Sequence, residues 1–85
     1  MPESIRVDIY SRPGCHLCDE AKDVIDRAAA HHRLDVRVLN VEDDPELEAQ
    51  FGSEIPVVFI EGKKAFKYRV DITQLERKLK ELWNR

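Results

Sequence analysis

The sequence predicts an α/β fold in which helices flank one mixed sheet of four strands, in the order β-α-β-α-β-β-α. Apolar and polar residues alternate around residues 5–10 and 34–41, which is the period of a strand with one buried face. A helical apolar period separates these two segments. The continuous apolar run Val57–Ile60 suits a strand buried on both faces, and residues 61–63 turn it into a last strand.

The first β-α-β unit is defined by its apolar residues. The first strand places alternate residues on one face: Ile5, Val7 and Ile9. After residues 11–14 the period becomes helical, and one helix face carries Leu17, Ala21, Val24, Ile25, Ala28 and Ala29. The second strand alternates through Leu34, Val36 and Val38 and runs to about Val41. The two strands should be parallel with a right-handed crossover.

A short helix follows the second strand. Asp44 supplies its N-cap, and Pro45 occupies the first helical position, where a missing N–H costs nothing. Gly52 is the expected C-terminal stop. We expect Leu47 and Phe51 on the inner face of this helix.

The chain is expected to finish with a strand over residues 64–68 and a helix. The inward face of this helix should carry Ile72, Leu75, Leu79, Leu82 and Trp83. Its cap is either Asp71 or Thr73, because each is followed three residues later by a glutamine or a glutamate. Glu76 and Lys80 form an outward i,i+4 pair.

Length and composition limit the number of domains and the classes of function that the chain can have. Eighty-five residues predict a single domain over residues 1–85, and 42% apolar residues are enough for one core. The formal net charge of −3 argues against non-specific nucleic-acid binding, which relies on a concentrated basic surface. The basic stretch at residues 63–69 is interrupted by apolar and aromatic residues, which is typical of a charged edge strand.

The expected location is the cytoplasm. No apolar run approaches the length that crosses a bilayer, and residues 1–4 show no signal-peptide core. Both cysteines lie in one C-x-x-C unit, so they cannot join distant parts of the chain, as structural disulfides of secreted proteins do. We expect a monomer without membrane or nucleic-acid partners.

The C-x-x-C of Cys15 and Cys18 carries the strongest chemical signal, because it follows a strand and opens a helix. Unpaired N–H groups and the helix dipole stabilise a thiolate there, so the pKa of the Cys15 thiol should lie below the ordinary value of about 8.5. Cys18 lies one turn deeper and is more shielded. We predict that Cys15 attacks and Cys18 resolves, while Pro13 and Gly14 shape the turn and leave Cys15 accessible.

His16 lies between the two cysteines and has two interpretations. Its imidazolium either lowers the pKa of the Cys15 thiol, or His16 is an exposed residue tolerated in the first turn. A positive charge at a helix N-terminus is itself unfavourable, which leaves the two interpretations balanced.

A metal site is the alternative interpretation of the C-x-x-C. A closed zinc site needs four ligands, whereas one C-x-x-C provides two. His31 and His32 lie about four helical turns from the cysteines and are interpreted as polar residues that close the helix. We therefore predict no metal in a monomer. A metal or iron–sulfur cluster shared by two subunits stays open.

Ile55, Pro56 and Val57 form a second motif, at the start of the buried strand, where proline is permitted. A cis bond before Pro56 would turn the Ile55 backbone groups toward a ligand, although trans is the more frequent form. Arg12, three residues before Cys15, is placed to meet a substrate carboxylate and to stabilise the thiolate. Arg69 is either a second anion contact across the groove or a plain surface charge.

Two segments resemble glutaredoxins. Residues 10–18 read Y-S-R-P-G-C-H-L-C, similar to the glutaredoxin active-site segment. Residues 51–62 resemble the second motif of that family, a proline followed by a short apolar strand and a glycine. The resemblance implies a thioredoxin fold, a cis bond before Pro56 beside the dithiol, and pairing of the Ile55 backbone with glutathione or a protein thiol.

The chain also departs from the glutaredoxin pattern. It has C-H-L-C where glutaredoxins usually have C-P-Y-C or C-x-x-S. Bulky residues fill positions 66–71, where glutaredoxins carry a glycine pair and an acidic residue that hold the γ-glutamyl end of glutathione. The chain is more similar to a short glutaredoxin-like family with C-x-x-C than to a typical glutaredoxin.

The resemblance implies a thiol–disulfide oxidoreductase that acts on protein or low-molecular-weight disulfides. No tightly bound cofactor is expected, and glutathione is the candidate reductant or co-substrate. The electron donor is expected to be glutathione or thioredoxin reductase. Two alternatives stay open: a carrier in which two subunits share a metal or iron–sulfur cluster through their C-x-x-C pairs, and a thioredoxin-fold binding module without activity.

Overall fold

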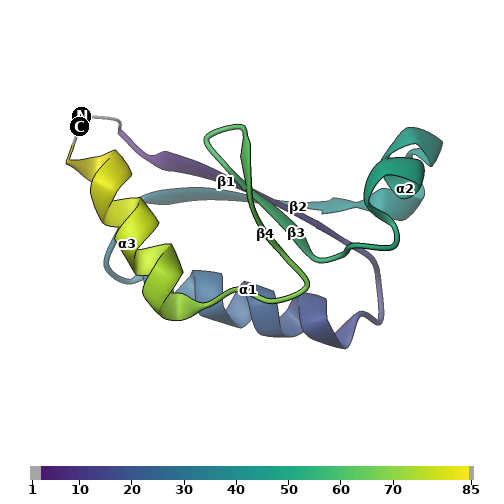
Figure 1. Ribbon diagram of the computed structural model, residues 1–85, viewed down its shortest axis with the longest axis horizontal. Helices are drawn as coiled ribbons and strands as arrows, with labels where there is room; N and C mark the ends of the chain where they lie inside the picture. Colours follow the sequence, from purple (N-terminus) through teal and green to yellow (C-terminus); the bar gives the residue numbers. More distant parts are fainter. Residues whose placement is uncertain (1–2, 85) are drawn as a thin grey trace.

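The computed structural model describes residues 3–84, in which four strands and three α-helices follow the predicted order (Figure 1). In chain order the elements are β1 Ile5–Ser11, α1 His16–Ala29, β2 Leu34–Asn40, the single 3-10 turn η1 Val41–Asp43, α2 Pro45–Phe51, β3 Val57–Ile60, β4 Lys63–Lys67 and α3 Ile72–Trp83. The prediction that residues 1–4 hold no signal-peptide core concerns a segment that lies partly outside the described residues.

The sheet has the strand order β2-β1-β3-β4. β1 and β2 are parallel, whereas β3 is antiparallel to both β1 and β4, so the predicted mixed sheet is confirmed. Tyr10, near the end of β1, lies opposite Val57, at the start of β3. Because β1 and β3 run in opposite directions, the loop that carries Cys15 and the loop that carries Pro56 meet at the same end of the sheet.

Helices α1 and α3 cover one face of the sheet (Figure 1). The core between these layers consists of Ile5, Val7, Ile9, Ile25, Ala28, Val58, Ile60, Phe66, Leu75 and Leu79. β1 contributes alternate residues because successive side chains of a strand point to opposite faces. In the internal strand β3, Val57 and Val58 are both fully buried, as its continuous apolar run predicted.

The other face of the sheet carries an aromatic cluster next to α2. The ring centroids of Tyr10 and Phe51 lie 4.7 Å apart, and the Phe59 ring meets both edge-on at 5.5 and 5.7 Å. Asp44 caps α2, with Pro45 in its first turn and its C-cap at the predicted glycine. α2 has no fully buried residue, so its predicted inner face is only partly covered and it is held to the sheet largely through Phe51.

Strand β2 departs from its predicted end and burial. It ends at Asn40, whose side chain accepts a hydrogen bond from the Glu42 backbone N–H and opens η1, which contains the fully buried Val41. Val38 is 51% exposed, although its partner Ile9 is fully buried. β2 lies at the edge of the sheet, where fewer neighbours cover its side chains.

The ends of the two long helices decide one open alternative and correct two residues that were predicted to face inward. Asp71 is the cap of α3, because its carboxylate accepts from the backbone N–H groups of Thr73 and Gln74. Ile72, the first residue of α3, is 38% exposed rather than inward. Ala29, the last residue of α1, is exposed as well. Both residues lie at the end of their helix.

Glu76 joins α3 to the chain after α1. Its Oε2 lies 2.8 Å from Nε2 of His32, whose side chain is only 10% exposed. The predicted outward pair of Glu76 with Lys80 was therefore wrong about where this carboxylate points. His32 does more than end a helix, since it holds two packed elements together.

Candidate active site

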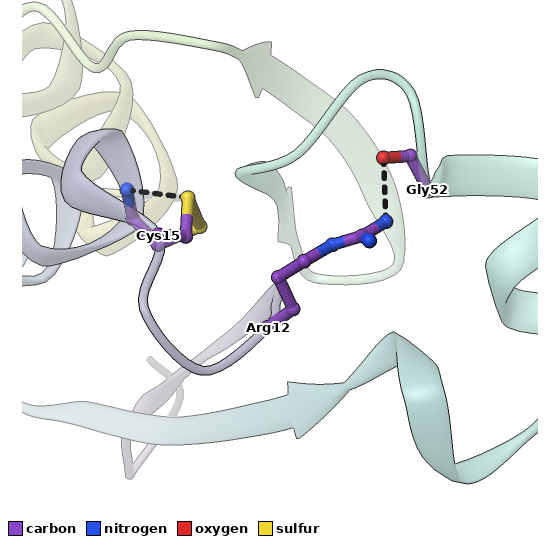
Figure 2. Close-up of a disulfide and its surroundings, with 4 residues drawn as sticks. Arg12, Cys15 and Gly52 are labelled. Carbon is purple, nitrogen blue, oxygen red and sulfur yellow. Dashed lines mark hydrogen bonds between the residues drawn. A yellow bond between two sulfur atoms is a disulfide. The ribbon is translucent and has the colours of Figure 1, made fainter.

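Cys15 and Cys18 form a disulfide at the N-terminus of α1, with their Cα atoms 5.2 Å apart (Figure 2). Cys15 is the N-cap of α1, and its Sγ accepts a hydrogen bond from the Cys18 backbone N–H at 3.2 Å. The cysteine thus takes the place that Ser, Thr or Asp usually holds at the start of a helix. Its sulfur lies at the positive end of the helix dipole.

The two cysteines differ in solvent access. Cys18 is 1% exposed and shares the buried side of α1 with Ala21 and Ile25, because residues three and four apart lie on one helix face. Cys15 is partly exposed. The loop therefore presents one sulfur to a partner and shields the other.

Pro13, Gly14 and His16 surround Cys15 on the exposed side. Gly14 has φ = +76°, a conformation that favours glycine, although a Cβ there would meet no atom within 4 Å. The requirement for glycine is thus conformational and not steric. His16 is the first residue of α1 and points to solvent, and its effect on the Cys15 thiol stays a prediction.

The peptide bond between Ile55 and Pro56 is cis. Pro56 and Val57 are buried and Ile55 is partly exposed. The backbone N–H of Tyr68, a residue with φ = +66°, donates to the Pro56 carbonyl at 2.9 Å. The end of β4 therefore holds this segment at the same end of the sheet as the dithiol loop. This role of Tyr68 was not predicted from the sequence, because a positive φ in a non-glycine residue has no reliable local signal.

Arg12 is placed differently from the sequence prediction. Its Nη2 donates to Glu48 Oε1 at 2.8 Å and to the Gly52 carbonyl at 2.8 Å, and its side chain extends away from Cys15 (Figure 2). The guanidinium that was expected beside the thiolate instead joins the dithiol loop to α2. Glu48 and Gly52 lie 36 and 40 positions away in the sequence, so no local pattern could have revealed them.

Arg69 is exposed and lines a cavity of about 460 Å³. Leu17, which lies between the two cysteines in the sequence, is on the opposite wall, together with Val24 of α1. Tyr68 lines the cavity beside Arg69. Its hydroxyl donates a hydrogen bond to the Ser53 carbonyl at 3.3 Å. The cavity therefore borders the redox motif between α1 and the segment that connects β4 to α3.

Glu54, just before the cis bond, forms ion pairs with Lys64 at 2.9 Å and Lys67 at 3.5 Å. The hydrogen bond and charge of Lys64, with a smaller contribution from Lys67, hold the pKa of the Glu54 carboxyl below its ordinary value of 4.5. Because the folded pKa lies below the unfolded one, this carboxylate stabilises the fold above the unfolded pKa. The contribution is lost as the pH falls through the folded pKa.

Glu54→Gln should therefore lower the urea midpoint of unfolding at pH 7. The difference from the wild type should shrink as the pH falls below the unfolded pKa and vanish once the pH is below the lowered pKa of the folded Glu54 carboxyl. The effect should be small because the pair is exposed and screened by water. Glu3→Gln, at an exposed carboxylate outside the helices, is the control and should leave the midpoint unchanged. Equal midpoints for wild type and Glu54→Gln at pH 7 would contradict a stabilising role for this pair.

Two features are absent from residues 3–84. No group of three or more His, Cys, Asp or Glu side chains there is arranged to hold a metal ion. No helix in this part of the chain is long and apolar enough to cross a membrane.

The fold and the site define a class of protein. A four-stranded mixed sheet with a dithiol at the N-terminus of its first helix, and a cis-proline loop at the same end, is the arrangement of the thioredoxin fold. The chain belongs to the glutaredoxin-like family: the family model described as Glutaredoxin-like domain (DUF836) matches residues 6–80.

Individual relatives agree with this assignment. A glutaredoxin-like protein of Dictyostelium discoideum is 30% identical over 79 residues, covering 86% of this chain and 73% of the relative. The solution structure of a Nitrosomonas europaea protein matches with a TM-score of 0.81 and 25% identity, covering 93% of this chain and 95% of the other. Thioredoxin 1 of Thermosipho africanus has a TM-score of 0.61 at 21% identity, covering 94% and 99%, and shows the same fold.

Proposed function

We propose that this protein is a thiol–disulfide oxidoreductase with a dithiol mechanism. The observation that carries the proposal is the asymmetric pair at the start of α1, in which Cys15 is partly exposed and Cys18 is buried one turn away. Membership of the glutaredoxin-like family supports the same class of chemistry.

In the proposed reaction the reduced Cys15 thiolate attacks one sulfur of a substrate disulfide. The other substrate sulfur leaves as a thiolate and takes up a proton, and a mixed disulfide forms on Cys15. The Cys18 thiol then loses its proton and attacks the Cys15 sulfur, releasing the second substrate thiol. Two electrons pass from the dithiol to the substrate, and the Cys15–Cys18 disulfide remains.

The local structure supports Cys15 as the attacking group. Its sulfur lies at the N-terminus of a 14-residue helix and accepts the Cys18 backbone N–H. Both features favour the charged thiolate over the neutral thiol. Cys18 has no comparable exposure, so it meets a substrate sulfur only after that sulfur is attached to Cys15.

We propose that substrates bind across the cis-proline loop. Ile55 is partly exposed beside the buried Pro56 and Val57, at the same end of the sheet as the dithiol, and its backbone groups are the proposed hydrogen-bonding partners of the substrate. Arg69 lies across the adjoining cavity and supplies a positive charge for an anionic substrate group. The substrates are protein or low-molecular-weight disulfides, and the proposed site of action is the reducing cytoplasm.

The proposal is tested by reduction of insulin and of hydroxyethyl disulfide with two electron-donating systems. One contains NADPH, glutathione reductase and glutathione, and the other contains NADPH and thioredoxin reductase. Turnover with one system only would identify the donor. Failure with both systems, for a folded protein with a reduced dithiol, would contradict the proposed function and favour an inactive binding module.

A pH profile of alkylation tests the activated thiolate directly. In Cys18→Ser, which leaves Cys15 as the only cysteine, iodoacetamide should react with a midpoint below about 8.5, the value of a free thiol. Cys15→Ser is the matched control, and its buried Cys18 should react much more slowly in the folded state. A Cys15 midpoint at the free-thiol value would rule out activation by the helix.

The wild-type protein, with both cysteines present, separates the cluster-carrier alternative. Protein purified without oxygen should be colourless and monomeric if the dithiol serves exchange chemistry. A coloured dimer that loses both colour and association on treatment with a chelator would favour a cluster shared by two C-x-x-C pairs.

A further inference from the structure

We propose that Arg12 is a positioning residue that fixes the dithiol loop to α2, and that Glu48 and Gly52 withhold its charge from the substrate. We call the three residues Arg12, Glu48 and Gly52 the loop clasp. The inference rests on the proposed function, because it concerns how that site is organised.

The clasp is made by one nitrogen with two acceptors. Arg12 Nη2 donates to the Glu48 carboxylate and to the Gly52 carbonyl, both at 2.8 Å (Figure 2 shows the second contact). The two acceptors come from successive turns of one segment, since the Gly52 backbone N–H itself donates to the Glu48 carbonyl at 2.9 Å. A single guanidinium thus ties the loop before Cys15 to the C-terminal end of α2.

Gly52 allows this arrangement because it has no side chain. A Cβ at this position would lie 2.5 Å from the Glu48 carbonyl oxygen and 2.6 Å from Glu48 Oε1. The second of these atoms is the one that accepts from Arg12. The Glu48 carboxylate therefore folds back over Gly52, and any larger residue there would displace it from the guanidinium.

The burial and the contacts of the Arg12 side chain support its role in the clasp. Its side chain is 32% exposed, and its Nε is fully buried without a hydrogen-bond partner among the described residues. An unpaired buried donor is unfavourable, so the two contacts of Nη2 must outweigh that cost. A substrate carboxylate would have to compete with Glu48 and the Gly52 carbonyl for Nη2 of this guanidinium.

The clasp acts on the site through the loop. Arg12 is the first residue after β1, and only Pro13 and Gly14 separate it from Cys15. A loop fixed at Arg12 holds the Cys15 sulfur in line with the Cys18 N–H. A loosened loop should weaken that hydrogen bond, and with it the preference for the thiolate.

The test compares pre-reduced variants on two small disulfides, neutral hydroxyethyl disulfide and anionic dithiodiglycolate, in single-turnover reactions that need no electron donor. Arg12→Ala and Glu48→Ala should each slow both reactions by the same factor, about threefold to tenfold, because the attacking sulfur is misplaced. The double variant should be no slower than Arg12→Ala alone, since both changes break one clasp. Glu46→Ala, on the same helix, is the control and should match the wild type.

A second readout is the pH profile of iodoacetamide reaction with Cys15, which should move to higher pH in Arg12→Ala and Glu48→Ala but not in Glu46→Ala. Gly52→Ala keeps both charges and should reproduce the shift. If Arg12→Ala does not fold, Gly52→Ala and Glu48→Ala test the proposal in its place. If the wild type reduces neither disulfide while the profiles shift as stated, the proposed function fails and the clasp stands.

Two results would overturn the proposal. The first is a selective loss of dithiodiglycolate reduction in Arg12→Ala with a gain in Glu48→Ala, which would make Arg12 a substrate contact restrained by Glu48. The second is a lower melting temperature in the clasp variants with unchanged rates and unchanged pH profiles. In that case the clasp would contribute only to folding.

Discussion

Cys15→Ser should abolish disulfide reduction, with a loss of about a thousandfold or more in kcat/KM. A serine hydroxyl does not ionise near neutral pH, and its oxygen cannot form the mixed disulfide through which both proposed steps pass. The variant should fold normally, because residue 15 is partly exposed and serine is itself a good N-cap. Steady-state reduction of hydroxyethyl disulfide and insulin measures the loss.

Cys18→Ser is the matched variant and should behave differently. It should carry out the first step and then stop, so that a mixed disulfide between Cys15 and a protein substrate accumulates and is seen by mass spectrometry. The opposite pattern, with a trapped adduct on Cys18 in Cys15→Ser, would reverse the roles assigned here. The 1% exposure of Cys18 is the physical reason to expect otherwise.

Leu75→Ala should destabilise the fold by about 2–5 kcal/mol, the range for removing a buried leucine and leaving a cavity. Leu75 is fully buried and belongs to the core that joins α3 to the sheet. Small domains have unfolding free energies of about 5–15 kcal/mol, so one such change removes a large share of the total. Urea unfolding followed by circular dichroism measures the difference.

Ile72→Ala is the control for Leu75→Ala on the same helix. Ile72 is 38% exposed at the first position of α3, so its truncation should cost less than about 1 kcal/mol. The contrast tests the orientation of α3. If Ile72→Ala cost as much as Leu75→Ala, the helix would face the sheet through a different side.

The strands, the helices and the dithiol were predicted from the sequence because each depends on local chemistry. The run Val57–Ile60 is apolar at every position and became the buried internal strand β3. Asp44 and Pro45 define the start of α2 wherever that helix lies. The spacing of Cys15 and Cys18 at a strand-to-helix junction likewise placed both sulfurs at a helix N-terminus.

Contacts between distant residues could not be predicted in the same way. Arg12 was predicted to contact a substrate because Cys15 is the functional residue nearest to it along the chain. Its partners Glu48 and Gly52 become neighbours only when the sheet brings β1 and the end of α2 together. The same holds for His32 and Glu76, which are 44 positions apart and meet because α1 and α3 pack on one face of the sheet.

The sequence by itself determined the element order, the dithiol and its place at a helix N-terminus, because periodicity, capping and turn preferences act over a few residues. Only the tertiary structure decided how completely Cys18 is buried and where the guanidinium of Arg12 points. Exposure is set by what packs over a residue, and an ion pair is set by which charges the fold brings within about 4 Å of each other. Both depend on segments that are remote in the chain, so they follow from the packed sheet and its helices.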